Sequence, residues 1–553
     1  MDELNHTTDT SGADSEGTSG TYQHYEERAI DVNTEAVGAV GPVVTNEEVS
    51  DIKADNTDHA IEGTDKFECY CCKAPADTVV LPPIVSVVPQ QTPDPSQPRG
   101  IKGPRPLVGV GNLWELLFEP MADLEERRFQ KYGKIYGVFE GSRPILKVGE
   151  PELIKQILVK DFNIFQTRRE ISNAKHPIVD VIVGLRSDEW KRMRTTAAPT
   201  TSGQLRRAYT LVDESADRLM TALAAQTDTG AVELDLKHWF GCYAIDVVAN
   251  CLFGTDTNAY QNPRDPFLTN ARLIFTPPWW KTLVTLLAPP WALKVVGIDS
   301  ETNREAVEFF HRIGQELVKR GKRDDILNPT ELMSQLFATL NGGFDGNSTA
   351  LTFAAHELAL NQDVQSRLRD ELVTLSAREQ LADTGKVGGE GEADEGREHD
   401  YDRLVKLPYL DAVLSETLRL HAHGLRPSRV PSEDYRLPGT DITVEKGLAV
   451  EFPMYAMHRC PDLYPRADRF WPDRFLPENR AQLPEYGFMP FGHGPRACVG
   501  QRFAEMAIKI ALVRIVTRFR LVTGGRTRVP LPVNKYVRFN SPVEAWVTLE
   551  SIE

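Results

Sequence analysis

The chain has 553 residues, and its composition, 41% hydrophobic and 26% charged, is typical of a globular protein. Seven cysteines in this length argue against a disulfide-stapled secreted fold and favour a reducing compartment. The formal net charge is −16, but residues 1–98 hold 19 Asp and Glu against 4 Lys and Arg, so the rest of the chain is close to neutral. This near-neutral part has no strong field that draws it to nucleic acid or repels it from membranes.

Residues 1–98 are predicted to be a disordered acidic tail that ends in a Pro-rich linker. The segment is rich in Asp, Glu, Thr, Ser and Gly, and it has too little apolar surface to offset the entropy of ordering. Its three cysteines, Cys69, Cys71 and Cys72, lack the fourth ligand of a zinc site, which leaves inert or acylated thiols as interpretations. Residues 99–553 are predicted to form one domain that carries the chemistry.

The sequence contains no run of 18 apolar residues, so it predicts no transmembrane helix. Asp2 and Glu3 stand where a secretory signal carries basic residues, and the same acidity argues against an Arg-rich mitochondrial transit peptide. We therefore expect an intracellular protein, in the cytoplasm or at the surface of the endoplasmic reticulum membrane.

From Gly103 onward the pattern is helical, with short strand-like pieces. Apolar residues recur at helical spacing most clearly in three segments, residues 332–360, 410–420 and 503–516. Two shorter runs have the character of strands, residues 145–148 and 448–452. The Gly- and Glu-rich segment 383–400 is typical of a surface loop. The fold class is therefore predicted to be mainly α, with small β sheets.

The most informative segment is the decapeptide Phe491–Gly500, FGHGPRACVG, which directly precedes a predicted helix. Gly492 and Gly494 permit positive φ, so the chain can turn tightly beside a flat cofactor. Cys498 lies just before the helix, where unpaired amides and the helix dipole stabilise a thiolate. A Gly-rich turn around a buried free cysteine is the alternative interpretation.

The decapeptide resembles the ligand loop of the cytochrome P450 superfamily, Phe-Gly-x-Gly-x-Arg-x-Cys-x-Gly. The resemblance implies a cytochrome P450 fold, a helical bundle with small sheets around haem b (iron protoporphyrin IX). It implies that Cys498 is the axial ligand of the haem iron, that Phe491 and Gly500 border the ring, and that Arg496 binds a propionate. A thiolate ligand pushes electron density onto the iron and favours cleavage of an O–O bond.

Two further segments match the family in the same order along the chain. Glu416-Thr417-Leu418-Arg419 resembles the Glu-x-x-Arg helix, whose spacing puts both charges on one helical face. The segment around Arg474, PDRF, resembles the one whose arginine joins that pair. The resemblance implies that Glu416, Arg419 and Arg474 form a buried structural triad rather than a catalytic group.

Other matches concern the haem propionates. WKRMR resembles the Trp-x-x-x-Arg helix, which implies that Trp190 and Arg194 reach a propionate. Arg429 matches a further propionate-binding arginine, with an ordinary surface charge as the alternative. The resemblance covers about residues 100–553, and it is greatest to the family-3 clan of xenobiotic and steroid oxidases.

One position departs from the family in a way that bears on mechanism. In the central helix, GGFDG aligns with the pattern Ala-Gly-x-Asp/Glu-Thr, so Asp345 supplies the acid while Gly346 replaces the threonine whose hydroxyl orients protons toward bound oxygen. Asp345 and Gly346 are therefore the expected catalytic positions. Ser348 and Thr349 follow two and three residues later, and at about 100° per residue they point elsewhere.

The chain also carries features with two interpretations each. Phe275, Trp279, Trp280 and Trp291 belong to an aromatic-apolar stretch that is either core or a peripheral membrane contact, as in the resembling clan. His421 and His423 could suggest a metal, but with no third ligand nearby they are expected to be ordinary polar residues.

The sequence has no Gly-rich nucleotide loop, so electrons have to come from a separate protein, expected to be an NADPH-dependent flavoprotein reductase. Four basic residues are either a docking patch for such a partner or a solvated face: Lys191, Arg192, Arg502 and Lys509.

The resemblance implies an oxidoreductase of the monooxygenase type, which inserts one oxygen atom from O₂ into a lipophilic small molecule and is membrane-associated. A haem-thiolate isomerase or dehydratase (a lyase) of lipid hydroperoxides or endoperoxides is the first alternative, because such an enzyme needs no proton-delivering threonine. A non-catalytic haem protein is the second. The identity of the substrate does not follow from the sequence, since pocket residues are scattered over loops.

Overall fold

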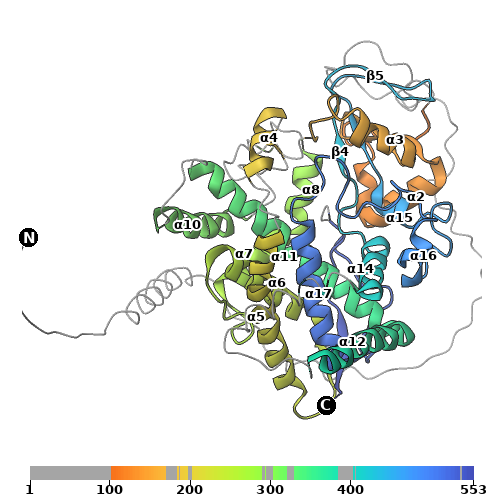
Figure 1. Cartoon of the computed structure of the whole chain (residues 1–553). Coiled ribbons are helices and arrows are strands. Elements are labelled where there is room, and N and C mark those ends of the chain that lie inside the picture. The colour runs from red at the N-terminus through yellow and green to blue at the C-terminus, as the bar shows by residue number, and fades with distance from the viewer. Residues whose placement is uncertain are drawn as a thin grey trace, which may run out of the picture. The chain divides into compact units, whose positions relative to one another are not determined.

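The computed structural model describes residues 101–169, 184–185, 187–196, 202–288, 303–320, 329–383, 403–404, 407–535 and 539–552, with residues 293 and 401. The acidic tail, the Pro-rich linker and most of the expected surface loop at 383–400 lie outside this part. Within it the chain is mainly helical and carries small sheets, which confirms the predicted fold class (Figure 1).

The helices include the three that the apolar periodicity predicts, which are α11, α14 and α17. The α-helices are α2 (Met121–Tyr132), α3 (Pro151–Lys155), α4 (Ser187–Thr196), α5 (Ser202–Thr227), α6 (Leu236–Phe253), α7 (Pro266–Phe275), α8 (Trp279–Leu287), α10 (Arg304–Arg320), α11 (Pro329–Leu360), α12 (Gln362–Asp383), α14 (Pro408–Leu420), α15 (Met454–His458), α16 (Pro477–Arg480) and α17 (Gln501–Arg518). Short helices of other types are η2 (Leu113–Leu117), η3 (Gln156–Lys160) and η4 (Pro472–Phe475). No helix of the described residues is long and apolar enough to cross a membrane.

Helix α11 is the central element of the helical part, with α6, α10, α14 and α17 packed against it (Figure 1). Helices α6 and α11 lie close together at Gly343, where a Cβ atom would lie 2.8 Å from the side chain of Val248. The N-terminus of α6 is capped by Asp235, whose carboxylate accepts a hydrogen bond from the backbone N–H of Lys237. The cap fixes where α6 begins, and with it the position of Lys237 beside α11.

Three sheets occur among the described residues. The largest has the order β1 (Ile135–Glu140), β2 (Arg143–Val148), β7 (Ala449–Glu451), β4 (Ser428–Arg429). The others have the orders β3 (Val232–Asp235), β9 (Trp546–Ser551), β8 (Phe519–Val522) and β5 (Tyr435–Arg436), β6 (Thr443–Val444). Strands β2 and β7 pair in parallel, whereas β7 and β4 pair antiparallel with Arg429 opposite Val450.

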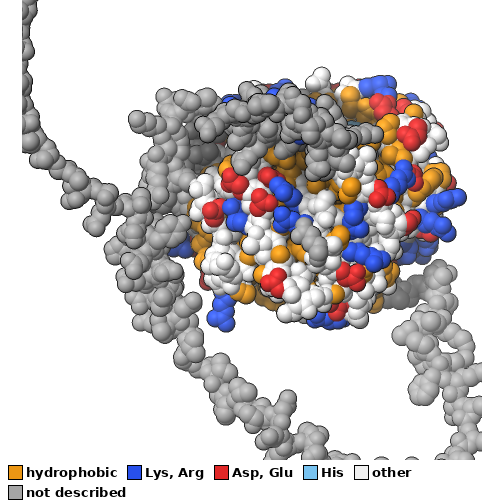
Figure 2. Space-filling view, turned by 60° about the horizontal axis from the view of Figure 1, so that its bottom comes forward, with side chains coloured by type: hydrophobic (Ala, Val, Ile, Leu, Met, Phe, Trp, Pro, Cys, Tyr) orange, Lys and Arg blue, Asp and Glu red, His pale blue; other side chains and the backbone are white. Residues whose placement is uncertain are grey.

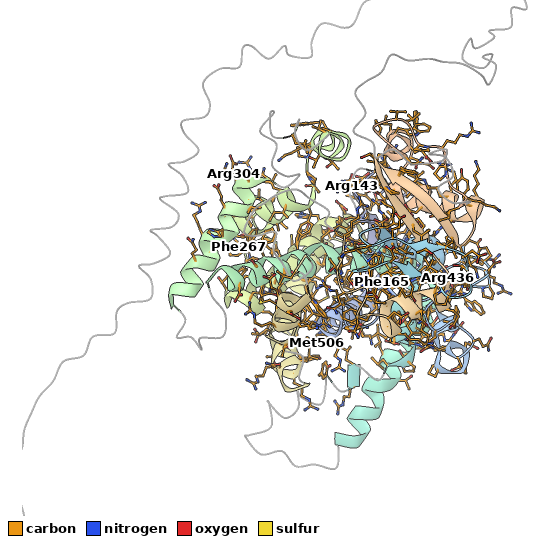
Figure 3. All side chains as sticks on the ribbon, turned by 90° about the horizontal axis from the view of Figure 1, so that it is seen from above. Arg143, Phe165, Phe267, Arg304, Arg436 and Met506 are labelled. Carbon is orange, nitrogen blue, oxygen red and sulfur yellow. The ribbon has the colours of Figure 1, made fainter. Side chains whose placement is uncertain are left out.

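Two large apolar clusters form the core. One includes Met506 of α17 and joins α5, α6, α11, α14 and the β8–β9 pair, and the other includes Phe165 and lies under the largest sheet. Figure 3 shows Met506 and Phe165 among the inner side chains, whereas Arg304 and Arg436 lie at the edge. The site described below lies where segments from both clusters meet.

Glu416, Arg419 and Arg474 meet in the interior, each at most 3% exposed. Arg419 donates from Nε and Nη2 to the two carboxylate oxygens of Glu416, at 2.8 and 2.9 Å, and Arg474 Nε donates to Glu416 Oε1 at 3.1 Å. Arg419 also donates to the carbonyl oxygens of His458 and Ala467, at 2.6 and 2.9 Å. One buried carboxylate thus fixes two arginines, which tie α14 to the segment that leads to the cysteine loop.

Glu416→Ala should lower the free energy of unfolding by about 3–5 kcal/mol, because it leaves two buried guanidinium groups without their anion. Chemical denaturation of the haem-loaded protein measures this loss. Glu308→Ala is the matched control, since it removes an exposed ion pair with Arg304 that is worth at most about 1 kcal/mol. Equal stability of the two variants would contradict a structural role for Glu416.

Candidate functional site

The loop before α17 is held in a tight conformation that presents Cys498. Gly492 and Gly494 both have φ +73°, and a Cβ atom at Gly494 would lie 2.1 Å from the carbonyl oxygen of Leu158, so glycine is required there. The backbone N–H of Cys498 donates to the carbonyl oxygen of Phe491 at 2.8 Å and closes the loop. The loop leaves the side chain of Cys498 exposed.

The sequence predicts that the start of α17 favours the thiolate form of Cys498, but in the structure burial of the side chain has the opposite effect. Burial raises the pKa of the Cys498 thiol, and it outweighs the opposing effects of the Gly500 amide and of the positive charges of Arg194 and Arg168. The side chain is therefore exposed at its surface yet surrounded by enough protein to disfavour an isolated thiolate. A cation bound at Sγ would reverse this balance, because a coordinating thiol is deprotonated.

Gly500 is the N-cap of α17, and no atom lies within 4 Å of the place where its Cβ would be. The helix start therefore leaves room beside Cys498. Phe491 is half-buried against the larger apolar cluster. Both residues lie at the loop in the positions that the resemblance implies for contacts with the haem ring.

Arginines from segments far apart in the sequence bind the backbone of this loop. Arg194 Nη1 of α4 donates to the carbonyl oxygen of Ala497 at 2.9 Å, and Arg168 Nη2 donates to that of Arg496 at 2.7 Å. The guanidinium of Arg496 lies over the ring of buried Trp190, 4.5 Å from its centroid. The structure thus brings Trp190, Arg194 and Arg496 together, as the matched motifs imply.

Arg429 on β4 adds a further buried positive charge to this group. Burial, together with the charges of Arg168 and Arg496, lowers the pKa of Arg429 well below its usual range, and burial with Arg168 lowers the pKa of Arg496 to about 10. The Nε atoms of Arg429 and Arg168 are buried and have no hydrogen-bond partner among the described residues. Like charges packed together in this way are unfavourable unless an anion joins them.

The contribution of Arg168 does not follow from the sequence motifs. Arg168 and Arg169 are adjacent, and only their partners distinguish them: Arg169 Nη1 donates to Glu451 Oε1 of β7 at 2.9 Å, whereas Arg168 turns to the cysteine loop. The one available signal was the pair of arginines itself, which is equally typical of a charged surface segment.

One face of α11 is open at two glycines. Gly342 and Gly346 lie one turn apart, and among the described residues no atom outside the neighbouring backbone of the helix lies within 4 Å of the Cβ position of either. Asp345 points in another direction, into a buried polar cluster in which Lys237 Nζ lies 3.3 Å from its Oδ1. Burial tends to raise the pKa of Asp345, but the charges of Lys237 and His423 outweigh it, and the pKa lies below the usual value.

A family model described as Cytochrome P450 matches residues 101–326 and 300–544. Cytochrome P450 3A25 of Mus musculus is 30% identical over 474 residues, which cover 79% of this chain and 88% of the relative. Cytochrome P450 3A6 of Oryctolagus cuniculus is 32% identical over 466 residues, with the same two shares. The chain belongs to the cytochrome P450 family. Its members are oxidoreductases of the monooxygenase type that bind haem b, and both of these relatives belong by name to family 3A.

The residues around Cys498 fit haem b. The cofactor carries two propionates, whose negative charges and four oxygen atoms match the positive charges gathered at the loop. A flat ring needs a tight loop and an uncrowded helix start beside it, and Gly494 and Gly500 provide these. Arg168, Arg194, Arg429 and Arg496 would hold the propionates, and Cys498 would hold the iron.

One expectation about the surface needs correction. Lys509 is buried and bound to Asp411 at 3.0 Å, so it cannot belong to a docking patch or to a solvated face. For Phe275 the structure favours the core interpretation, because the side chain is half-buried with its ring 5.6 Å from that of Phe344.

Of the other candidates for surface contacts, some are exposed in the structure and some lie outside the described residues. Trp280 is 49% exposed, whereas the side chain of Trp279 and all of Trp291 are among the residues not described. Lys191 and Arg502 are exposed, and Arg192 is bound to Glu331. Figure 2 shows basic and acidic side chains interspersed on one face of the molecule, without a large area of one sign.

Arg429→Leu should speed the loss of haem about 10- to 100-fold, because hydrogen bonds to charged groups contribute about 1.5–3 kcal/mol. The rate at which an excess of a haem-accepting protein removes the cofactor measures this effect. Arg436→Leu is the control, since that arginine is exposed and its partners are exposed Asp441 and the carbonyl oxygen of Thr440. An unchanged rate for Arg429→Leu would show that Arg429 does not bind the cofactor.

Proposed function

We propose that this chain is a monooxygenase that inserts one oxygen atom from O₂ into a lipophilic small molecule, with Cys498 as the axial ligand of its haem. The electrons come from a partner, an NADPH-dependent flavoprotein reductase. The observation that carries the proposal is the group of buried arginines around exposed Cys498, on a loop that leaves room for a flat dianionic cofactor.

The residues around Cys498 would hold different parts of the haem. Arg168 and Arg429 come from two backbone segments that the Thr167–Val430 bridge brings together, and both would bind the propionates. Arg194, Arg496 and Trp190 would bind them from α4 and the cysteine loop. Phe491 and Gly500 border the ring on the side of Cys498. When bound, the haem supplies the chemistry of O₂ activation.

The open face of α11 is the side on which substrate and oxygen are held. Gly342 and Gly346 keep backbone rather than side chains at this face, which leaves space for an apolar molecule. Asp345 lies beside this face and stays ionised, because Lys237 and His423 hold its pKa down.

Exposed Trp280 at the start of α8 supports peripheral contact of the enzyme with a membrane surface, as proposed for a protein at the endoplasmic reticulum. Lys191 and Arg502 are the remaining exposed basic candidates for contact with an acidic reductase.

Cys498→Ser should abolish the red-shifted absorption band of the reduced, CO-bound protein, because that band depends on a thiolate ligand. The same variant should no longer transfer ¹⁸O from labelled O₂ to a lipophilic substrate. Cys460→Ser is the matched control, since Cys460 is a half-buried free cysteine far along the chain from the loop. Retention of the band in Cys498→Ser would overturn the assignment of the ligand.

A second candidate function, rearrangement or dehydration of a lipid hydroperoxide, rests on one observation. Gly346 offers no hydroxyl, and such an enzyme needs none, because its substrate brings the O–O bond. A monooxygenase without that hydroxyl loses assistance that is typically worth about 10²–10⁴-fold unless another group supplies it.

Gly346→Thr should raise the amount of oxygenated product formed per electron if the enzyme is a monooxygenase, since the open space at Gly346 admits the new side chain. In a hydroperoxide isomerase the same change should leave turnover unchanged or lower it by crowding. Gly342→Thr is the control, because it adds the same side chain to the same open face one turn away. If neither activity responds to Gly346→Thr, Gly346 is not the functional departure.

A further inference from the structure

A buried polar cluster lies behind the open face of α11 and is not explained by haem binding. Lys237 Nζ is its centre: it lies 3.3 Å from Asp345 Oδ1, 2.9 Å from Thr349 Oγ1 and 3.2 Å from Ser541 Oγ. The Ser541 hydroxyl also donates to Asp345 Oδ1 at 3.3 Å. The cluster joins α6, α11 and the C-terminal segment, and it keeps a charged carboxylate next to Gly346.

His423 lies at the other oxygen of this carboxylate. Its Nε2 lies 3.6 Å from Asp345 Oδ2, so the ring and the carboxylate form a pair at the limit of direct contact. The ring stacks on Phe539 with centroids 4.8 Å apart and planes 6° apart, and the backbone N–H of Asn540 donates to the His423 carbonyl oxygen at 2.9 Å. Phe539 and Asn540 of the C-terminal segment thus fix the orientation of the imidazole, while a quarter of the surface of its side chain stays exposed.

The loop that carries His423 is anchored to α11 at a second point. His421 Nε2 lies 2.7 Å from Glu357 Oε1, and its ring stacks on Phe353 with centroids 4.2 Å apart. Two imidazole–carboxylate pairs therefore hold one short loop along α11, at positions three turns apart. Only the pair formed by His423 lies beside Gly346, and among the described residues neither histidine belongs to a group of three metal-binding side chains.

We propose that His423, paired with Asp345, is the proton-donating group on the substrate side of the haem and does the work of the hydroxyl that Gly346 lacks. The proposal rests on the monooxygenase function. Transfer of one oxygen atom from O₂ to a substrate releases the other atom as water, and this consumes two electrons from the reductase and two protons. His423 Nε2 faces Asp345, which stabilises the charged ring, and the buried Nδ1, which has no hydrogen-bond partner among the described residues, is the atom that presents the proton.

The same cluster offers a route by which the proton is replaced. The side chain of His423 is 25% exposed, so the ring can take up a replacement proton from solvent while Lys237 remains bound at Asp345 Oδ1. The charged and titratable groups that face the ring are Asp345 of α11 and Lys237 of α6. Burial, together with the charge of Lys237, lowers the pKa of His423 below its usual value despite the opposing charge of Asp345, so a protonated ring gives up its proton readily.

The first test is spectroscopic and needs no turnover. In the reduced, CO-bound protein, a donor close to the ligand polarises the bound CO and lowers its C–O stretching frequency. His423→Phe keeps an aromatic ring against Phe539 but removes both nitrogens, so the C–O band should move to higher frequency. His421→Phe is the matched control, because it removes the other imidazole–carboxylate pair of the same loop, and its band should stay in place.

The second test follows the electrons. In His423→Phe the rate of product formation should fall by about 10²-fold, the lower end of what a positioned acid contributes, while electrons appear as hydrogen peroxide. Gly346→Thr introduced into His423→Phe should recover product, because it restores a hydroxyl at the position His423 serves. His423→Gln, which retains an N–H donor, should lose less than His423→Phe.

The outcomes separate this proposal from the proposed function. A wild-type protein without the red-shifted CO band overturns the haem-thiolate function, and the role of His423 with it. A normal band, combined with a C–O frequency and peroxide yield in His423→Phe equal to those of wild type, overturns the role of His423 alone. Equal effects of His423→Phe and His421→Phe also overturn it, because they would show that both histidines act only by anchoring the loop.

Discussion

Buried positive charge around the cysteine loop is the constraint on which the arrangement of the site depends. Arg168 and Arg194 reach the carbonyl oxygens of consecutive loop residues, although both lie more than 300 positions earlier in the chain. Arg429 enters from the largest sheet, and its pKa is lowered by burial and by its arginine neighbours. The positive charges lie in a buried region of low dielectric constant, where they raise one another's electrostatic energy. A dianionic cofactor would make this arrangement favourable.

The contrast with the other buried charges of the molecule supports this interpretation. Glu416 is shared by two arginines, and those arginines also donate to backbone carbonyls, so the cluster is satisfied by the protein alone. Lys147 is likewise buried between Glu125 and Glu451. Charges that serve the fold have carboxylates from the chain as partners, whereas Arg429 and Arg168 have buried Nε atoms without one among the described residues. This difference favours Arg168 and Arg429 as charges that would bind the cofactor.

The sequence predicted what depends on local pattern. The helices α11, α14 and α17 follow from apolar spacing, and the cysteine loop follows from its glycines, whose positive φ is a local property. It failed where burial or pairing is decided by distant segments. Lys509 was expected at the surface, but Asp411 of α14 covers it, and Arg168 was overlooked because Glu451, some 280 positions later, selects Arg169 for the sheet.

Gly346 is a second case in which the local sequence pattern does not show which groups lie nearby in the folded chain. The family pattern places an acid and a hydroxyl at consecutive positions of one helix, so a glycine there reads as a missing function. In the folded chain the acid is retained and surrounded by hydroxyls, a lysine and an imidazole that come from α6, from the loop after α14 and from the C-terminal segment. Consecutive residues on a helix point about 100° apart, so a group brought in by another segment can lie as close to the open face as the next residue does. The chemistry at Asp345 therefore depends on its neighbours in space as well as on the next residue of the helix.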